Sequence, residues 1–291
     1  MGPYELFIQP FAEFGFMRRA LVACVALALG SAPMGTLLVL RRMSLMGDTM
    51  AHAVLPGAAI GFALAGFSLP AMGAGGLAAA LLVALLAGWV AQVTTQREDA
   101  SFAAFYLIAL AAGVLIVSLH GTPVDLMHVL FGSILAVDDS ALIGVAAVAS
   151  LTLLAVAALY RPLLVASVDP GFLRSVGGAE RTLHFVFLGL VVLNLVAGFQ
   201  ALGTLMAVGL MMLPATAARF WAHEVWSQAG VATLIALASA AGGLLLSYHL
   251  QLPSGPAIVL LAGAGYIVSF LAGRHDSLLA RRLALHAHRV A

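Results

Sequence analysis

An aspartate and a histidine stand four residues apart near the start of the stretch RRMSLMGDTMAHAVLPGAAIGF (41–62). On a helix, Asp48 and His52 share one face and lie one turn apart. A carboxylate oxygen and a neutral imidazole nitrogen are both ligands for borderline divalent cations such as Zn²⁺ or Mn²⁺. In a plainer interpretation, Asp48 is the N-cap of a helix that begins at Thr49. The residue types alone leave both interpretations open, although an ionisable residue beside hydrocarbon is a functional candidate.

The residues that follow this pair predict how its helix is positioned. Pro56 stands four residues after His52 and has no N–H to donate to the His52 carbonyl, so helical bonding is loosened beside the candidate ligand. Gly57 and Gly61 form a face of small residues on which a second helix can pack closely.

The composition places the whole chain in a membrane. Of its 291 residues, 63% are hydrophobic and 9% are charged, whereas a soluble domain has about 25% charged residues. We expect an all-α, polytopic membrane protein with a single transmembrane domain over residues 1–291, because stretches of about 17–25 apolar residues cross a bilayer as helices. The apolar stretches lie near 20–40, 50–66, 69–93, 101–119, 141–160, 182–199, 202–218, 228–249 and 254–273.

The arginines predict the orientation of these spans. They fall in every second connection, and the connections between contain none. Because positively charged loops face the cytoplasm, we expect nine crossings with the N-terminus outside and a basic cytoplasmic tail at 274–291. Arg18 and Arg19 do not fit this pattern. An arrangement of eight spans with one re-entrant or interfacial segment also remains open.

Several kinds of chemistry are excluded by residues that the chain lacks. All 13 basic residues are arginines, so there is no lysine for a nucleotide-binding phosphate loop or a Schiff base. The single cysteine, Cys24, excludes an internal disulfide and a cysteine-cluster metal site. We therefore expect that the chain is not an enzyme and that any ATP is hydrolysed by a separate subunit. A net charge of +1 gives no indication of nucleic acid as a partner.

A short helix is predicted inside the longest inner loop, at about 161–181. Asp169 is a good N-cap, Pro170 suits the first helical position, and two glycines, Gly177 and Gly178, end the helix. We expect this helix to expose Phe172, Leu173 and Arg174 to the cytoplasm and to dock on a partner, because so short a helix is unstable alone. An ordinary structured loop is the alternative.

The outer loop at 120–139 contains a second acid–histidine pair, Asp125 and His128, three residues apart. These residues are candidate ligands of an outer metal site, although Asp125 also fits the cap of a half-helix packed against the spans. The methionines within 203–221 are expected in the core. His184 and His249 lie at span ends, where we expect ordinary interfacial histidines.

Five segments together resemble the membrane permeases of bacterial zinc/manganese-type metal-ion ABC transporters. They occur in the order typical of that family and extend over nearly the whole chain. The segments are RRMSLMGDTMAHAVLPGAAIGF (41–62), VDLMHVLFGSILAV (124–137), VDPGFLRSVG (168–177), GTLMAVGLMMLPATAARFW (203–221) and LPSGPAIVLLAG (252–263).

The resemblance implies a homodimeric permease in the bacterial cytoplasmic (inner) membrane, surrounded by lipid. It further implies two cytoplasmic ATPase subunits and a periplasmic or extracytoplasmic metal-binding protein as partners. By this resemblance Asp48 and His52 coordinate the transported cation, and residues 169–176 form the helix that couples to the ATPase. The cation, zinc in preference to manganese, is cargo, and no permanently bound cofactor is expected.

Two other functions remain open from the sequence. One is a proton-coupled secondary metal carrier, in which Asp48 would be the protonation site; the helix-sized inner loop and the lack of a clear inverted repeat disfavour it. The other is a permease for a metal chelate such as a siderophore, whose cargo would not need a carboxylate–imidazole pair.

Overall fold

The computed structural model describes residues 2–43, 46–66, 68–120 and 137–280, and all regular secondary structure in these ranges is helical. This confirms the predicted all-α fold. The helices are α1 (Pro3–Phe7), α2 (Gln9–Glu13), α3 (Gly15–Leu40), α4 (Met46–Ala65), α5 (Leu69–Val93), α6 (Glu98–His120), α8 (Asp139–Val168), α9 (Pro170–Ser175), α10 (Glu180–Leu202), α11 (Thr204–Ala218), α12 (Val225–Leu250) and α13 (Ser254–Ala272).

Eight of the described helices are long and apolar enough to cross a membrane. The predicted span at 202–218 corresponds to α11, which has 15 residues and at about 1.5 Å per residue is shorter than a hydrocarbon core of about 30 Å. α11 follows α10 directly, because Gly203, with a φ of 91°, turns the chain between them. The apolar stretch at 202–218 therefore forms a short helix of the bundle.

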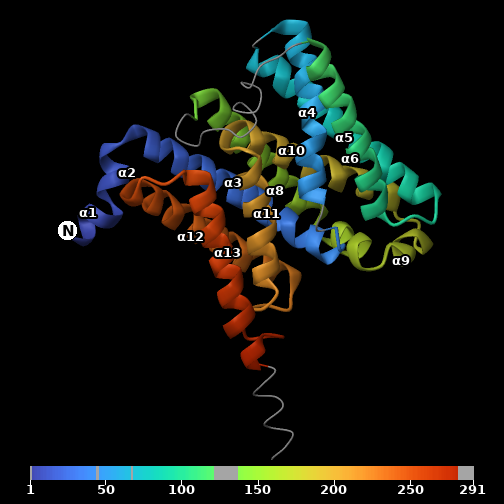
Figure 1. Cartoon of the computed structure of the whole chain (residues 1–291). Coiled ribbons are helices and arrows are strands. Elements are labelled where there is room, and N and C mark those ends of the chain that lie inside the picture. The colour runs from blue at the N-terminus through green and yellow to red at the C-terminus, as the bar shows by residue number, and fades with distance from the viewer. Residues whose placement is uncertain (1, 44–45, 67, 121–136, 281–291) are drawn as a thin grey trace, which may run out of the picture.

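The core of the molecule forms around α3. This helix runs through the middle of the bundle and contacts α8, α10, α11 and α12, while α4, α5 and α6 pack together on one side and α12 and α13 on the other (Figure 1). Small residues let the helices approach: Gly30 on α3 faces Asn194 on α10, whose amide donates to the Thr152 hydroxyl at 2.6 Å. The core includes Met206 and Met211, which confirms the prediction for the methionines of this stretch.

Arg18 and Arg19 lie in the first turns of α3, after the short helices α1 and α2. Arg19 Nε lies 3.2 Å from Asp139 Oδ1 at the start of α8, and Arg18 donates to the Ala12 carbonyl. One of the two arginines that depart from the pattern therefore has a carboxylate partner at the surface.

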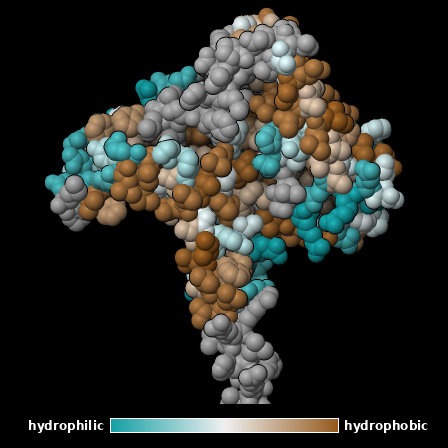
Figure 2. Space-filling view, viewed as in Figure 1, coloured by the Kyte–Doolittle hydropathy of each residue, from teal (hydrophilic) through white to brown (hydrophobic). Residues whose placement is uncertain are grey.

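The surface matches a bilayer environment. Hydrophobic residues extend over much of the face in Figure 2, and hydrophilic ones gather where α9 lies and also at the end where α1 and α2 lie. α8 continues to Val168, past Arg161 and Pro162, so the predicted inner loop is shorter than residues 161–181. Between α8 and α10 only α9 and two brief connections remain.

Candidate metal-binding site

Asp48 and His52 lie on the first two turns of α4, and their side chains share one face. The Asp48 Oδ1 and His52 Nε2 atoms are 3.9 Å apart, and the two side chains are 71% and 41% exposed, respectively. A separation of 3.9 Å is too long for a hydrogen bond. Metal–oxygen and metal–nitrogen bonds are about 2.0–2.2 Å long, so one ion could bind both atoms at this separation.

The start of α4 bears on the alternative role of Asp48. The helix begins at Met46, so Asp48 belongs to its first turn and does not precede it. The expectation of an N-cap before a helix starting at Thr49 is therefore wrong. A favourable interaction of the carboxylate with the positive end of the helix dipole remains as the non-metal alternative.

The described residues of one chain supply only part of a coordination shell. Within the described ranges, no group of three or more histidine, cysteine, aspartate or glutamate side chains could hold a metal. The two candidate ligands on α4 are partly exposed, so any further ligand would come from water, from another chain or from residues outside the described ranges. The second candidate pair, Asp125 and His128, lies outside the described residues.

A tyrosine from a second helix contacts the candidate ligand. The rings of His52 and Tyr106, on α6, have centroids 5.4 Å apart and are tilted by 35°. The contact places an aromatic ring of α6 beside the imidazole on the face of α4 that carries Asp48. No local pattern marks Tyr106 in the sequence, since it is one aromatic residue in an apolar helix.

The backbone of α4 is fixed by close packing on both sides. A Cβ atom at Gly57 would collide with the Gly75 carbonyl of α5, and one at Gly61 would collide with the Ala71 carbonyl. On the other side, a Cβ at Gly113 of α6 would lie 3.0 Å from the Pro56 nitrogen. The predicted small-residue face is confirmed, and it holds the helix that carries Asp48 and His52.

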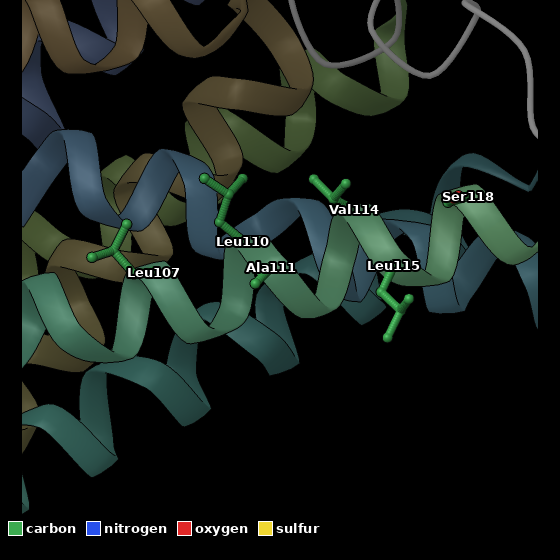
Figure 3. Close-up of a pocket in the computed structure, with 6 residues that line it drawn as sticks. All are labelled: Leu107, Leu110, Ala111, Val114, Leu115 and Ser118. Atoms are coloured by element: carbon green, nitrogen blue, oxygen red, sulfur yellow. The ribbon is translucent and has the colours of Figure 1, made fainter.

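An apolar depression runs along α6 beyond Tyr106. It is open and shallow, and Ser118 is its one polar lining residue; the others are Leu107, Leu110, Ala111, Val114 and Leu115 (Figure 3). Such a surface offers no ligand to a cation. Among the described residues of this region, the candidate cation ligands therefore lie on the face of α4.

The short inner helix forms as predicted. The Asp169 carboxylate accepts a hydrogen bond of 2.8 Å from the Phe172 N–H, Pro170 occupies the first turn, and Gly177 has a φ of 75° after the helix. Gly178 donates to the Leu173 carbonyl at 2.9 Å. The cap and the terminating glycines are thereby confirmed.

The exposed side of α9 differs in one residue from the expectation. Phe172 is 55% exposed and Arg174 is also exposed. Leu173 is only half-exposed, because it turns back against Gly178. The Arg174 guanidinium lies 3.9 Å from a Glu180 carboxylate oxygen at the start of α10.

The expectation of an ordinary interfacial position is wrong for His184. This residue is 4% exposed and its Nδ1 lies 3.4 Å from the Arg41 guanidinium. His249 is exposed, and one ring nitrogen lies 3.0 Å from the Leu6 carbonyl oxygen, which agrees with a surface position.

Membrane-length helices, a pair of candidate cation ligands on one of them and a capped helix in a connection are together typical of a polytopic transport permease. The chain matches the ABC 3 transport family over residues 13–273. It belongs to this family of ABC transporter permeases.

Relatives with names extend over nearly the whole chain. It is 31% identical over 265 residues to the manganese import system permease protein ScaB of Streptococcus parasanguinis, covering 91% of this chain and 93% of that protein. It is 32% identical over 274 residues to the manganese transport system membrane protein MntC of Listeria innocua, covering 94% and 96%, respectively. The chelated iron transport system membrane protein YfeD of Yersinia pestis is 28% identical over 281 residues, covering 97% of this chain and 93% of that protein.

A solved structure has the same fold. PsaBC from Streptococcus pneumoniae in complex with Fab aligns with a TM-score of 0.81 and 28% identity, covering 95% of this chain and 98% of that chain. This confirms the fold inferred from the sequence. The chain is thus the permease of a metal ABC importer.

Proposed function

We propose that this permease moves a divalent transition-metal cation into the cytoplasm and that Asp48 and His52 bind the cation in transit. The main support is the separation of 3.9 Å between Asp48 Oδ1 and His52 Nε2 on the accessible face of α4. A carboxylate and an imidazole are a mixed oxygen and nitrogen ligand set, which suits Mn²⁺, Fe²⁺ and Zn²⁺. Cations of this kind need such ligands because a channel of low dielectric disfavours a bare charge.

Two copies of the chain would complete the site. Asp48 and His52 from each of two permeases supply four ligands, two oxygens and two nitrogens. One pair replaces too little of the hydration shell, whereas a symmetric set replaces it transiently. The two carboxylates also offset the 2+ charge of the ion, and such attraction strengthens where water is scarce. We therefore propose a homodimer with the cation path between its subunits.

ATPase subunits would drive the transport cycle through α9. Its exposed Phe172 and the flanking Val168 and Val176, which are also exposed, form an apolar surface at the end of a capped helix. An extracytoplasmic metal-binding protein would deliver the ion on the opposite side. ATP would be hydrolysed on the separate subunits, so the permease itself makes and breaks no covalent bond.

We propose manganese as the principal cargo. Relatives over 30% identical, among them ScaB of Streptococcus parasanguinis and MntC of Listeria innocua, carry names that specify manganese. Zinc, the cation expected first from the sequence, has no such support. A chelate is the second candidate cargo, because YfeD is named for chelated iron. A chelate brings its own ligands, however, and would leave Asp48 and His52 without a role.

Reconstitution tests this proposal. The permease, its ATPase and its binding protein would be placed in vesicles, and uptake of radioactive Mn²⁺ would be measured with Zn²⁺ and Fe²⁺ as competitors. We expect ATP-dependent Mn²⁺ uptake that a protonophore does not abolish. Uptake driven by a proton gradient without ATP would support a secondary carrier, and uptake only of an iron chelate would replace the free cation as cargo.

A further inference from the structure

Arg41 follows α3 directly and precedes α4, the helix that carries Asp48 and His52. Its Nε donates a hydrogen bond of 2.9 Å to the Ser167 hydroxyl, and one terminal nitrogen lies 3.4 Å from His184 Nδ1. The guanidinium carbon is 4.0 Å from the centre of the Phe187 ring. One arginine thus contacts three residues that are more than 120 positions away in the chain.

These contacts place Arg41 against both sides of the α9 connection. Ser167 is in the last turn of α8, two residues before the cap Asp169, while His184 is in the second turn of α10 and Phe187 in the third. The α8–α9–α10 hairpin is therefore bonded on its incoming and outgoing helices to the segment that leads into α4. Asp48 follows seven residues after Arg41.

Arg41 contacts the Ser167 hydroxyl and the His184 ring, while the two nearby carboxylates, Glu98 and Glu180, face other residues. Burial lowers the pKa of the guanidinium to about 10, against the opposing effect of Glu98 and Glu180, so Arg41 is a cation at neutral pH. In the described part of the chain it forms no ion pair at contact distance; Glu98 lies 3.7 Å from His184, and Glu180 faces Arg174 of α9.

Two buried donors beside this cation have no hydrogen-bond partner among the described residues. They are the second terminal nitrogen of Arg41 and Nε2 of His184. When Arg41 donates to His184 Nδ1, the proton of that imidazole is on Nε2, which then needs an acceptor. Unsatisfied buried donors are costly, so a carboxylate that came within reach would be stabilised by these two donors.

We propose that Arg41 is the positioning residue that links movement of the α8–α9–α10 hairpin to α4 and its ligands. Movement of α9 separates Arg174 from Glu180. Arg41 then leaves its partners Ser167 and His184 and binds a carboxylate. The start of α4 moves with Arg41. Arg41 never touches the cargo. This inference rests on the proposed function, in which an ATPase docks on α9.

The test compares uptake with ATP hydrolysis in one preparation. Wild-type, Arg41→Gln and Arg41→Lys permeases would be reconstituted with ATPase and binding protein, and Mn²⁺ uptake per ATP measured. We expect ATP hydrolysis within about twofold of wild type and uptake per ATP at least about tenfold lower for both variants. Lys keeps the charge but has no planar fork that reaches Ser167 and His184 together. The control is Arg42→Gln, which removes a neighbouring exposed charge and should leave the ratio unchanged.

A purely structural role would give other results. Unchanged Mn²⁺ uptake per ATP would overturn the proposal, whether uptake and hydrolysis both stay at the wild-type level or fall equally. Weaker equilibrium Mn²⁺ binding in the nucleotide-free complex would overturn it as well. If the Arg41 variants do not assemble, the milder Ser167→Ala decides, with an expected loss of about threefold in uptake per ATP; no loss would refute the link.

Failure of the proposed function is separable from failure of this link. It would appear as absent Mn²⁺ uptake by the wild-type complex. A wild-type complex that pumps Mn²⁺ and an Arg41→Gln complex with the same uptake per ATP would instead reject only the role of Arg41.

Discussion

The Gly57 backbone on α4 lies so close to the Gly75 carbonyl on α5 that no methyl group fits between them. This contact fixes the helix that carries Asp48 and His52 against its neighbour. It also explains the small residues of this stretch. Any side chain at Gly57 would force α4 outward and would displace the candidate ligands Asp48 and His52.

Gly57→Ala should therefore destabilise the permease by about 1–3 kcal/mol, as overpacking in well-packed cores does. Thermal unfolding in detergent would measure the change. The matched control is Gly263→Ala in α13, where an added Cβ meets no atom within 4 Å; there the higher helix propensity of alanine should leave stability unchanged or raise it by up to about 1 kcal/mol. Equal effects of the two substitutions would contradict the role of the α4–α5 contact.

Tyr106 is predicted to position His52 through its ring alone. Tyr106→Phe keeps the ring and should transport Mn²⁺ at close to the wild-type rate. Tyr106→Ala frees the imidazole and should raise the concentration for half-maximal uptake by about threefold to tenfold, which corresponds to about 0.7–1.4 kcal/mol. A hydroxyl that itself bound the cation would reverse the prediction for Tyr106→Phe.

How far the sequence predicts this molecule depends on the range of the interactions involved. The cap at Asp169 and the stop at Gly177 depend on neighbouring residues, so the sequence predicted α9 correctly. Leu173 was misjudged because its burial depends on the turn at Gly178 that brings the chain back over it. The helix α8 extends to Val168, beyond its predicted end near residue 160, because the chain stays helical through Pro162.

The features that depend on distant residues left no pattern to find. Asp48 and His52 could be proposed from the sequence because both candidate ligands belong to one helix. The contact of Arg41 with His184 joins residues 143 positions apart, and the approach of Tyr106 to His52 joins two helices. Neither pairing changes the periodicity or composition from which the helices were predicted.

The isolated chain is predicted neither to bind nor to hydrolyse ATP. It contains no lysine, and a phosphate loop uses a lysine to contact the nucleotide phosphates. Nucleotide binding and phosphate release would be measured on the purified permease before and after addition of its ATPase. Turnover by the permease alone, at a rate above that of a mock purification, would contradict its assignment as a subunit without catalysis.

Phe172→Asp should separate the permease from its ATPase. The side chain is 55% exposed on a helix of six residues, so a charge there leaves the fold intact while it removes an apolar contact. We expect loss of ATPase co-purification together with loss of uptake. Leu279→Asp provides the control, because Leu279 is 53% exposed beyond α13. Co-purification that survives Phe172→Asp but not Leu279→Asp would place the docking surface elsewhere.

Asp48→Asn distinguishes a metal ligand from a residue that only favours the start of a helix. Asparagine keeps the size of the side chain but removes its negative charge, so a cation in the path loses one carboxylate from each permease. We expect uptake to fall by at least about tenfold, roughly 1.4 kcal/mol if read as a barrier, with assembly preserved. His52→Ala should give a similar loss. Asp48→Glu should also impair uptake, because its longer arm displaces the oxygen from His52 Nε2.

Asp99 supplies the matched control for this last prediction, since it lies in the first turn of α6 as Asp48 lies in the first turn of α4. An interaction with the helix dipole alone is worth about 0.3–1 kcal/mol in stability, so on that account Asp48→Asn and Asp99→Asn should behave alike. Uptake in vesicles and thermal unfolding would be measured for both variants. If Asp48→Asn transports as well as Asp99→Asn, then Asp48 is not a ligand. If only Asp48→Asn loses uptake while both unfold at similar temperatures, the charge of Asp48 acts on the cation and not on the helix.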